Sequence, residues 1–187
     1  MILVCDSFSL SNNPSPDFTI RPKGNIWGIG LRKIKVNLNM EKKIVYVDMD
    51  NVLVDFRSGI MKIDHDTFAR YDDRLDEVPG IFSLMTPMQG AIESYELLCK
   101  HFDTYILSTS PWENPTALNE KLDWVKKYLG KHAYKRLITS HHKHLNHGDY
   151  LIDDREKNGA DKFVGELILF GGEQFPDWKS VMSYLIP

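Results

Sequence analysis

Two pairs of aspartates are the residues of this chain most capable of chemistry. Asp48 and Asp50 directly follow a run of β-forming residues, and Asp153 and Asp154 directly follow an apolar pair. Carboxylates at the end of a hydrophobic strand are costly to bury unless a cation or a reacting group compensates their charge. Asp is also a common turn former, but a turn does not require a second acidic pair much later in the chain. We therefore expect the two pairs to belong to one site.

Two further polar segments lie between the aspartate pairs. Ser108 and Thr109 end a second β-forming run, and Lys143 lies among histidines shortly before the second acidic pair. Hydroxyls can hold an oxyanion without adding charge, and an ammonium can neutralise carboxylates. Four polar segments in this order indicate a single site.

This order of motifs resembles that of the haloacid dehalogenase superfamily of phosphotransferases. Three segments are more similar still to its 5'(3')-deoxyribonucleotidase branch. They are Asp-Met-Asp-Asn-Val-Leu-Val-Asp from residue 48, Thr-Ser-Pro from residue 109 and Asp-Tyr-Leu-Ile-Asp-Asp-Arg from residue 149. The resemblance covers residues 40–187, which is most of the chain.

The hydrophobic pattern from Lys43 onward alternates between strand and helix periods. We expect strands at about 44–48, 104–108, 136–139, 150–152 and 166–170. We expect helices after residue 56, at 91–101, from Pro115 to Leu129 and from Pro176 onward, the third burying Leu118, Leu122, Val125 and Leu129. This alternation predicts an α/β fold, a Rossmann-like parallel sheet covered by helices on both faces. Ligands of such sheets bind beyond the carboxyl ends of the strands, where all four motifs lie.

The resemblance implies a role for each motif residue. Asp48 would be the nucleophile that forms a phospho-aspartate, and Asp50 would act as general acid and then as general base. Lys143 would neutralise the nucleophile and the phosphate together. Either Ser108 or Thr109 would hold a phosphoryl oxygen: counting from the strand start favours Ser108, and counting back from the following Ser-Pro favours Thr109.

Hard oxygen donors beside phosphate chemistry indicate Mg²⁺ as the cofactor. We expect side-chain ligands from Asp48 and Asp153 and the main-chain carbonyl of Asp50, with Asp154 acting through water or a neighbouring group. Arg155 is expected to be a surface partner of an adjacent acidic residue.

The segment 141–147 holds four histidines, which raises a structural zinc site as an alternative. Zinc sites of this kind require a second ligand pair at suitable spacing, and the two cysteines, Cys5 and Cys99, are remote in sequence. We favour a solvated loop that presents Lys143.

Residues 56–88 occupy the place where this family inserts a small helical cap, and caps close over the phosphate and carry specificity. Residues 64–88 read as irregular and acidic. Phe56, Phe82, Met85 and Trp112 are the side chains best suited to meet an apolar leaving group such as a nucleobase, although each is also a candidate for the core. We take Phe56 and Trp112 as the substrate-binding candidates.

The composition restricts the class of protein. The chain has 187 residues, 42% of them hydrophobic, and a formal net charge of −3. It can bury a sizeable core, and its charge gives no electrostatic case for a nucleic-acid polymer as partner. No apolar run approaches the length of a membrane span, and two cysteines form no disulfide framework. We expect a reduced, cytoplasmic protein, and a homodimer is one possible oligomeric state.

Residues 1–39 differ in composition from the rest, with several prolines and a Ser-Asn cluster. We expect them to be a flexible extension or the product of a mis-assigned start at Met1 instead of Met40. A short added hairpin near Gly28 and Gly30 is the alternative. Residues 40–187 would then form the phosphatase domain.

The leading function is Mg²⁺-dependent hydrolysis of a small phosphate monoester, a deoxyribonucleoside monophosphate, through a phospho-aspartate. The alternatives are a phosphatase of the same superfamily acting on another small metabolite and a catalytically silent domain that binds phosphate or a partner protein. A polynucleotide 3'-phosphatase is disfavoured, because it would need a basic groove where residues 64–77 are acidic.

Overall fold

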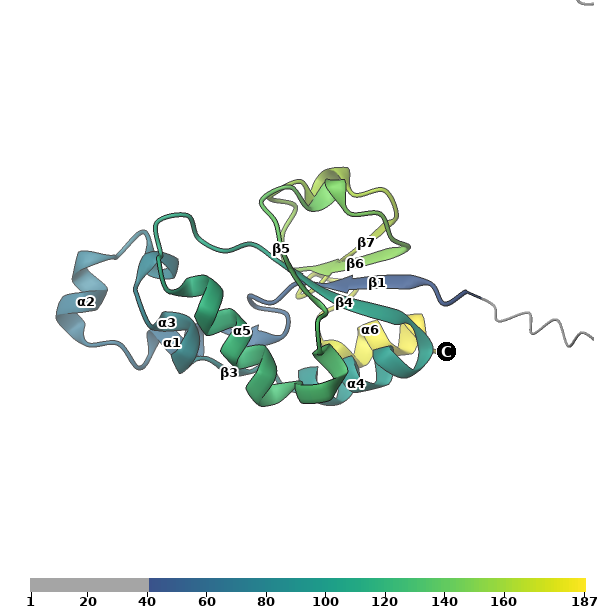
Figure 1. Cartoon of the computed structure of the whole chain (residues 1–187), viewed down its shortest axis with the longest axis horizontal. Coiled ribbons are helices and arrows are strands. Elements are labelled where there is room, and N and C mark those ends of the chain that lie inside the picture. Colours follow the sequence, from purple (N-terminus) through teal and green to yellow (C-terminus); the bar gives the residue numbers. More distant parts are fainter. Residues whose placement is uncertain (1–40) are drawn as a thin grey trace, which may run out of the picture. The chain divides into compact units, whose positions relative to one another are not determined.

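The structure is a computed structural model that describes residues 41–187. The expectations for residues 1–39 lie outside the described part of the chain. The largest elements of the described part are a parallel sheet and the helices packed on it (Figure 1).

Five parallel strands form the central sheet in the order β5-β4-β1-β6-β7. Their bounds are β1 Ile44–Val47, β4 Asp103–Ser108, β5 Leu137–Thr139, β6 Tyr150–Asp153 and β7 Glu166–Leu169. β1 lies in the middle, and Val47 is in register with Ile106 of β4 on one side and Ile152 of β6 on the other. The carboxyl ends of β1, β4 and β6 therefore meet at one edge of the sheet. The predicted α/β class and the parallel sheet are confirmed.

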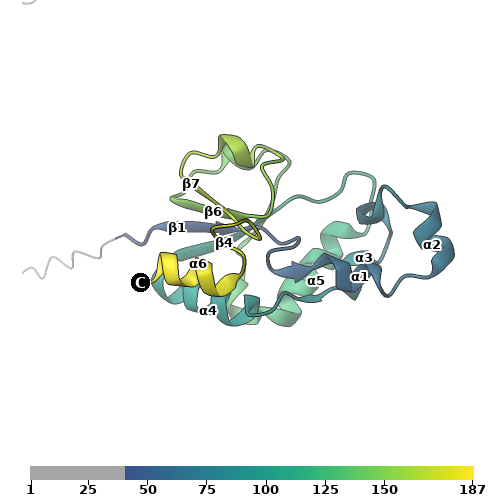
Figure 2. The same cartoon turned by 180° about the vertical axis from the view of Figure 1, so that it is seen from behind.

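One face of the sheet carries the three long helices. They are α4 Ala91–His101, α5 Ala117–Tyr128 and α6 Trp178–Leu185, and Figures 1 and 2 show α4 and α6 on the same side of the sheet. Val45 and Val47 of β1 point into this larger core. Tyr46 points to the opposite face, where a smaller cluster forms with Leu107, Leu151, Ala160 and Phe163. Short 3₁₀ turns, η3 Lys143–Leu145 and η4 Ala160–Lys162, belong to the segments on that face.

The segment between β1 and α4 folds into short helices instead of the irregular stretch expected from the sequence. It contains α1 Phe56–Ile60, α2 His65–Arg70, η1 Leu75–Glu77 and α3 Ile81–Leu84, flanked by the antiparallel pair β2 Val54–Asp55 and β3 Thr86–Pro87. The acidic residues that suggested irregularity include helix caps, since Asp64 accepts a hydrogen bond from the backbone N–H of Thr67. Figure 1 shows α1, α2 and α3 grouped beside one end of α5.

The buried face of α5 differs from the stripe predicted for this helix. Leu118 and Leu122 are exposed, whereas Glu120, Lys121 and Trp124 are buried. The helix also begins at Ala117 instead of Pro115, and in the loop before it the side chain of Asn114 accepts a hydrogen bond from the backbone N–H of Thr116. Val125 and Leu129 are buried as predicted, but the prediction failed for Leu118 and Leu122 because it assigned burial by hydrophobicity alone. Two charged side chains are buried here with polar partners from other elements.

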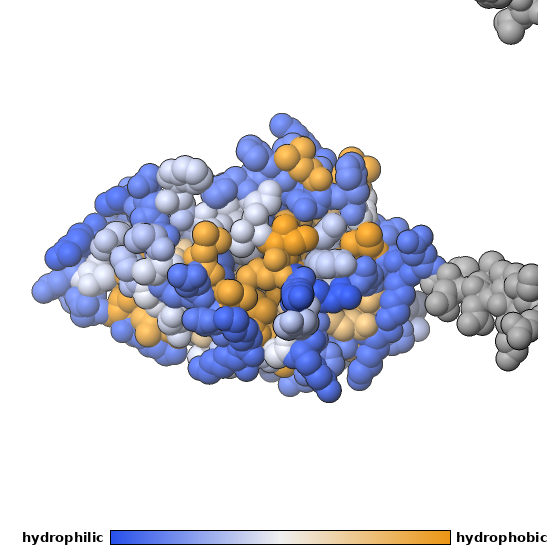
Figure 3. Space-filling view, viewed as in Figure 1, coloured by the Kyte–Doolittle hydropathy of each residue, from blue (hydrophilic) through white to orange (hydrophobic). Residues whose placement is uncertain are grey.

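Figure 3 shows hydrophobic residues at the surface over the region of α5 and β5, and further hydrophobic residues elsewhere on the same face. The exposed Leu118 and Leu122 of α5 contribute to the apolar surface of the molecule.

Within residues 41–187, none of the helices has both the length and the apolar character that a membrane span requires. The 3₁₀ turn that follows α5, η2 Gly130–Ala133, leads into β5.

Candidate active site

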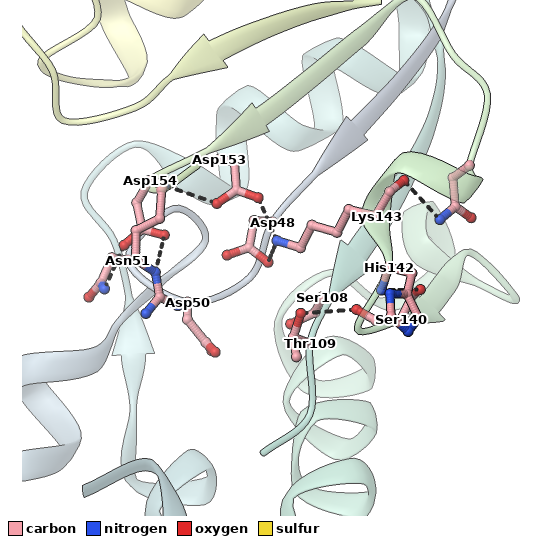
Figure 4. Close-up of polar contacts among 12 residues, drawn as sticks. Asp48, Asp50, Asn51, Ser108, Thr109, Ser140, His142, Lys143, Asp153 and Asp154 are labelled. Atoms are coloured by element: carbon pink, nitrogen blue, oxygen red, sulfur yellow. Dashed lines mark hydrogen bonds and ion pairs between the residues drawn. The ribbon is translucent and has the colours of Figure 1, made fainter. Parts of the chain in front are cut away.

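Asp48 lies at the carboxyl end of the central strand, buried and held by backbone and side-chain contacts. Its N–H donates to the carbonyl of Ile152 at 2.8 Å, which continues the pairing of β1 with β6. Its carboxylate Oδ1 lies 2.8 Å from the Nζ of Lys143. The same ammonium lies 2.5 Å from Oδ2 of Asp153. The structure therefore brings together three of the residues predicted for the site, from three separate segments (Figure 4).

The charges of this buried group perturb one another. Burial and the neighbouring negative charge of Asp48 together raise the pKa of the Asp153 carboxyl to about 7, although Lys143 opposes both effects. Burial by itself would lower the pKa of Lys143, but the charges of Asp48 and Asp153 outweigh it and the pKa lies above its ordinary value. When both carboxylates are ionised, one ammonium leaves the group with excess negative charge.

Asp154 adds a third carboxylate to this group. Asp48, Asp153 and Asp154 each offer an oxygen, and these oxygens lie within 4.8 Å of one another. The Nδ2 of Asn51 donates to Oδ2 of Asp154 at 3.0 Å, and the N–H of Arg155 donates to Oδ1 of Asp153. Three hard oxygen donors with excess negative charge are suited to a divalent cation.

The histidines of segment 141–147 form no comparable group. Among the described residues, the acidic trio is the one cluster of three or more side chains with the geometry of a metal site. His142 and His144 lie edge to face, and His141 lies edge to face with Trp112. Lys143 is buried in the turn η3, while His141, His142 and His147 are exposed, so the segment presents this lysine to the site from an otherwise solvent-facing loop.

Asp50 does not join the acidic trio but faces a second lysine, Lys121 of α5. The Nζ of Lys121 lies 2.8 Å from Oδ1 and 2.7 Å from Oδ2 of Asp50. The Lys121 side chain is fully buried, and its Nζ also donates to the Oγ of Ser108 at 2.9 Å. Burial raises the pKa of Asp50, and the charge of Lys121 opposes this effect.

The two hydroxyl residues at the end of β4 have different environments. Ser108 is fully buried, and its Oγ accepts from Lys121. Thr109 is half-buried, and its Oγ1 donates to the carbonyl of Ser140 at 2.9 Å. The backbone of the two loops is joined as well, since the N–H of Ser140 donates to the carbonyl of Ser108. Thr109 is thus the more accessible of the two candidates for a phosphate contact.

A cavity of about 270 Å³ opens beside Asp50, and we call it the leaving-group cavity. Its lining residues are Asp50, Asn51, Phe56, Asp72, Asp73, Leu75, Asp76 and Arg155. Phe56 therefore shares a cavity with the predicted acid and base. Trp112 is not among the lining residues and is 84% exposed. A larger cavity of about 850 Å³ touches Asn51 and Asp154 and lies between α4 and α6, and Asp50 is not among its lining residues.

Phe82 and Met85 are buried, so they belong to the core and not to the surface that meets a ligand. Phe82 packs edge to face with Phe56, with ring centroids 6.1 Å apart. The N–H groups of Gly80 and Phe82 donate to the carboxylate of Glu120, which lies beside Lys121 on α5. The first turn of α3 is therefore anchored to the helix that also carries the second lysine.

Sequence reasoning missed Lys121. It is a lysine within an amphipathic helix, and such a residue is ordinarily exposed. One signal was available in the sequence, because Glu120, Lys121 and Trp124 follow the 3–4 spacing of a single helix face. That spacing says which residues share a face, but not that the face is buried.

The central strand of the parallel sheet is followed by paired aspartates, and a neighbouring strand is followed by a hydroxyl. A lysine and a second acidic pair complete the group. This arrangement is that of a phosphotransferase of the haloacid dehalogenase type. Residues 74–176 match the family described as "5' nucleotidase, deoxy (Pyrimidine), cytosolic type C protein". A relative from Vibrio phage KVP40, provisionally named a 5'(3')-deoxyribonucleotidase, is 57% identical over 161 residues, which cover 86% of this chain and 95% of the relative. The chain belongs to this 5'-nucleotidase family.

Two more distant proteins are also similar. The human 5'(3')-deoxyribonucleotidase, cytosolic type, is 27% identical over 167 residues, covering 74% of this chain and 78% of the relative. A solved hydrolase of the haloacid dehalogenase superfamily from Geobacter sulfurreducens aligns with 77% of this chain and 96% of its own, at 12% identity and a TM-score of 0.48. Family membership confirms the expected resemblance and the expected enzyme class, a phosphoric monoester hydrolase.

Proposed function

We propose that this protein hydrolyses deoxyribonucleoside monophosphates to a nucleoside and inorganic phosphate through a phospho-Asp48 intermediate. The observation that carries the proposal is the position of the Lys143 ammonium, 2.8 Å from Asp48 and 2.5 Å from Asp153 at the carboxyl edge of the sheet. A phosphate dianion approaching Asp48 would meet this positive charge, which lowers the cost of bringing two anions together. The names of the relatives support the choice of substrate.

The acidic trio would hold Mg²⁺. Asp48 and Asp153 would be direct oxygen ligands, as expected from the sequence, and Asp154, for which we expected an indirect role, lies close enough to be a third. We propose the main-chain carbonyl of Asp50 as a further ligand of the same ion. When bound, the ion would act as a Lewis acid on the phosphoryl group.

The proposed reaction has two steps. In the first, an Asp48 oxygen attacks phosphorus, the ester P–O bond breaks, and the protonated Asp50 gives its proton to the leaving nucleoside oxygen. In the second, Asp50 takes a proton from water as that water attacks the phosphorus, and the bond from phosphorus to Asp48 breaks. Phosphate leaves, and Asp50 is again protonated.

We assign the phosphate contact of the second motif to Thr109. Its half-buried hydroxyl already lies at the edge of the site, where the carbonyl of Ser140 orients it. Ser108 is fully buried, and its Oγ is bound to Lys121. The leaving nucleoside would occupy the leaving-group cavity, in which Phe56 supplies an aromatic surface next to Asp50.

A kinetic panel tests the proposal. Phosphate release by the purified protein with Mg²⁺ should give a higher kcat/KM for deoxyribonucleoside monophosphates than for ribonucleoside monophosphates or hexose phosphates. A sugar phosphate as the best substrate would favour another metabolite phosphatase of the superfamily. Absence of hydrolysis across the panel would favour a silent phosphate-binding domain. The Asp48→Asn protein, prepared identically, controls for contaminating phosphatases.

A matched pair of variants tests the leaving-group cavity. Phe56→Ala should raise the KM for a nucleotide by about tenfold, because an aromatic contact contributes about 1 kcal/mol and its burial adds to this. Trp112→Ala removes a larger but 84% exposed side chain outside the cavity and should change the KM less. The reverse order would place the base beside Trp112.

A further inference from the structure

The ammonium of Lys121 has all of its hydrogen-bonding capacity engaged inside the protein. Lys121 is fully buried on α5, and its Nζ contacts both carboxylate oxygens of Asp50, at 2.8 and 2.7 Å, and the Oγ of Ser108 at 2.9 Å. An ammonium has three N–H donors, and these contacts account for three of them. Lys121 therefore has no donor left for a phosphate oxygen, in contrast to a lysine that binds substrate directly.

The remaining side of the ammonium is covered by an aromatic ring. The Nζ of Lys121 lies 4.4 Å from the centroid of the buried Phe82 ring, a distance suited to a cation–π contact. The backbone of Phe82 is anchored to the helix that carries Lys121, because its N–H donates to the carboxylate of Glu120. The Lys121 ammonium is therefore surrounded by a carboxylate, a hydroxyl and an aromatic ring.

The orientation of Asp50 follows from this position. Asp50 is two residues from Asp48, yet its side chain is not part of the acidic trio and is turned toward Lys121. Figure 4 shows the Asp50 side chain directed away from Asp48 and Asp153. Asp50 also lines the leaving-group cavity, so the carboxylate that Lys121 holds is the one that faces a leaving group.

We propose that Lys121 is a positioning residue that holds the Asp50 carboxylate toward the leaving-group oxygen and away from the acidic trio. This inference rests on the proposed function, in which Asp50 exchanges protons with the leaving group and with water. Lys121 acts through Asp50 and does not touch the substrate.

A structural role for Lys121, as a buried link between α5 and the sheet, would affect all substrates alike. A positioning role predicts dependence on the leaving group. A nucleoside leaves as a basic alkoxide and needs the proton of Asp50, whereas p-nitrophenolate is a stable anion that leaves without one. Because kcat/KM reports the steps up to the first phosphoryl transfer, the two substrates separate proton donation from phosphate binding.

The experiment compares the wild type and Lys121→Met with the best deoxyribonucleotide and with p-nitrophenyl phosphate. We expect Lys121→Met to lower kcat/KM for the deoxyribonucleotide by about 100-fold, the scale of general acid catalysis, and for p-nitrophenyl phosphate by less than about fivefold. Equal losses for the two substrates, or no loss for either, would overturn the inference. If the wild type hydrolyses neither compound, the proposed function itself fails, which is a different result.

A double-mutant cycle covers the case in which Lys121→Met is unstable because Asp50 is left buried without a partner. Asp50→Asn and Asp50→Asn/Lys121→Met are compared with the deoxyribonucleotide, since the double variant removes both charges of the pair. If Lys121 acts through Asp50, then Lys121→Met should change kcat/KM by less than about threefold once Asp50 is replaced. A further loss of tenfold or more would show an independent role and contradict the proposal.

Discussion

Asn51 donates a hydrogen bond from Nδ2 to Oδ2 of Asp154 at 3.0 Å, which joins the turn after the first strand to the second acidic pair. Asn51 has a φ of 57°, in the left-handed region that asparagine tolerates better than most residues. The same residue therefore shapes the turn through its backbone and orients a carboxylate of the acidic trio through its side chain.

Two variants of Asn51 separate these roles. Asn51→Gly keeps access to a positive φ but loses the donor, whereas Asn51→Ala loses both. We expect both to weaken Mg²⁺ affinity by about tenfold, because a partner that orients a metal-binding carboxylate has effects of this size. Titration calorimetry measures the affinity. Wild-type affinity in Asn51→Gly would mean that the backbone conformation, and not the hydrogen bond, is what matters.

Replacement of Asp48 by asparagine should abolish turnover while preserving the fold. The side chain keeps its size but loses its nucleophilic oxygen, so the rate should fall by several orders of magnitude. Phosphate release measures the rate, and circular dichroism checks the fold. Activity above about a tenth of the wild-type rate would be incompatible with covalent catalysis by Asp48.

Lys143→Met should make the stability of the protein depend on Mg²⁺. Without Lys143, the buried carboxylates of Asp48 and Asp153 lose their ion-pair partner, and breaking such a pair costs about 3–5 kcal/mol. A divalent cation bound to the same carboxylates would offset that loss. We expect Mg²⁺ to raise the Tm of Lys143→Met more than that of the wild type. A smaller rise in the variant would argue against a shared site for the ion and the lysine.

Activity should disappear in excess chelator and return with Mg²⁺ but not with Ca²⁺. Mg²⁺ favours six ligands at short distances, whereas Ca²⁺ takes more ligands at longer ones and would not hold the phosphoryl group equally close to Asp48. Phosphate release after dialysis and addition of each ion measures this. Full activity in the presence of chelator would contradict the assignment of the acidic trio to a metal.

A protein that begins at Met40 should retain the activity and Tm of the full chain. Residues 40–187 form a compact unit, and every residue assigned to the site lies within it. A matched comparison of kcat/KM and thermal unfolding checks this. A Tm lower by several degrees, or a tenfold loss of kcat/KM, would show that the first 39 residues contribute to the domain.

The sequence by itself determined which strand ends bring the candidate site residues together. Asp48, Asp153 and Ser108 each follow a hydrophobic run, and parallel strands align their carboxyl ends, so their convergence could be predicted without coordinates. The α4 helix was predicted with the bounds that the structure shows, because its periodic apolar residues and flanking signals are local. Lys143 was predicted from motif order, and the structure adds the ion pairs that explain its place.

The tertiary structure alone decided which face of α5 is buried and what its charged residues do. Hydrophobicity favoured Leu118 and Leu122 as core residues, yet both are exposed, and Lys121 is buried instead. The partner of Lys121, Asp50, lies 71 residues away in sequence, and Glu120 meets a backbone N–H that lies 40 residues away. A charged side chain is buried only when its partners compensate the loss of water, and such partners are brought together only by folding.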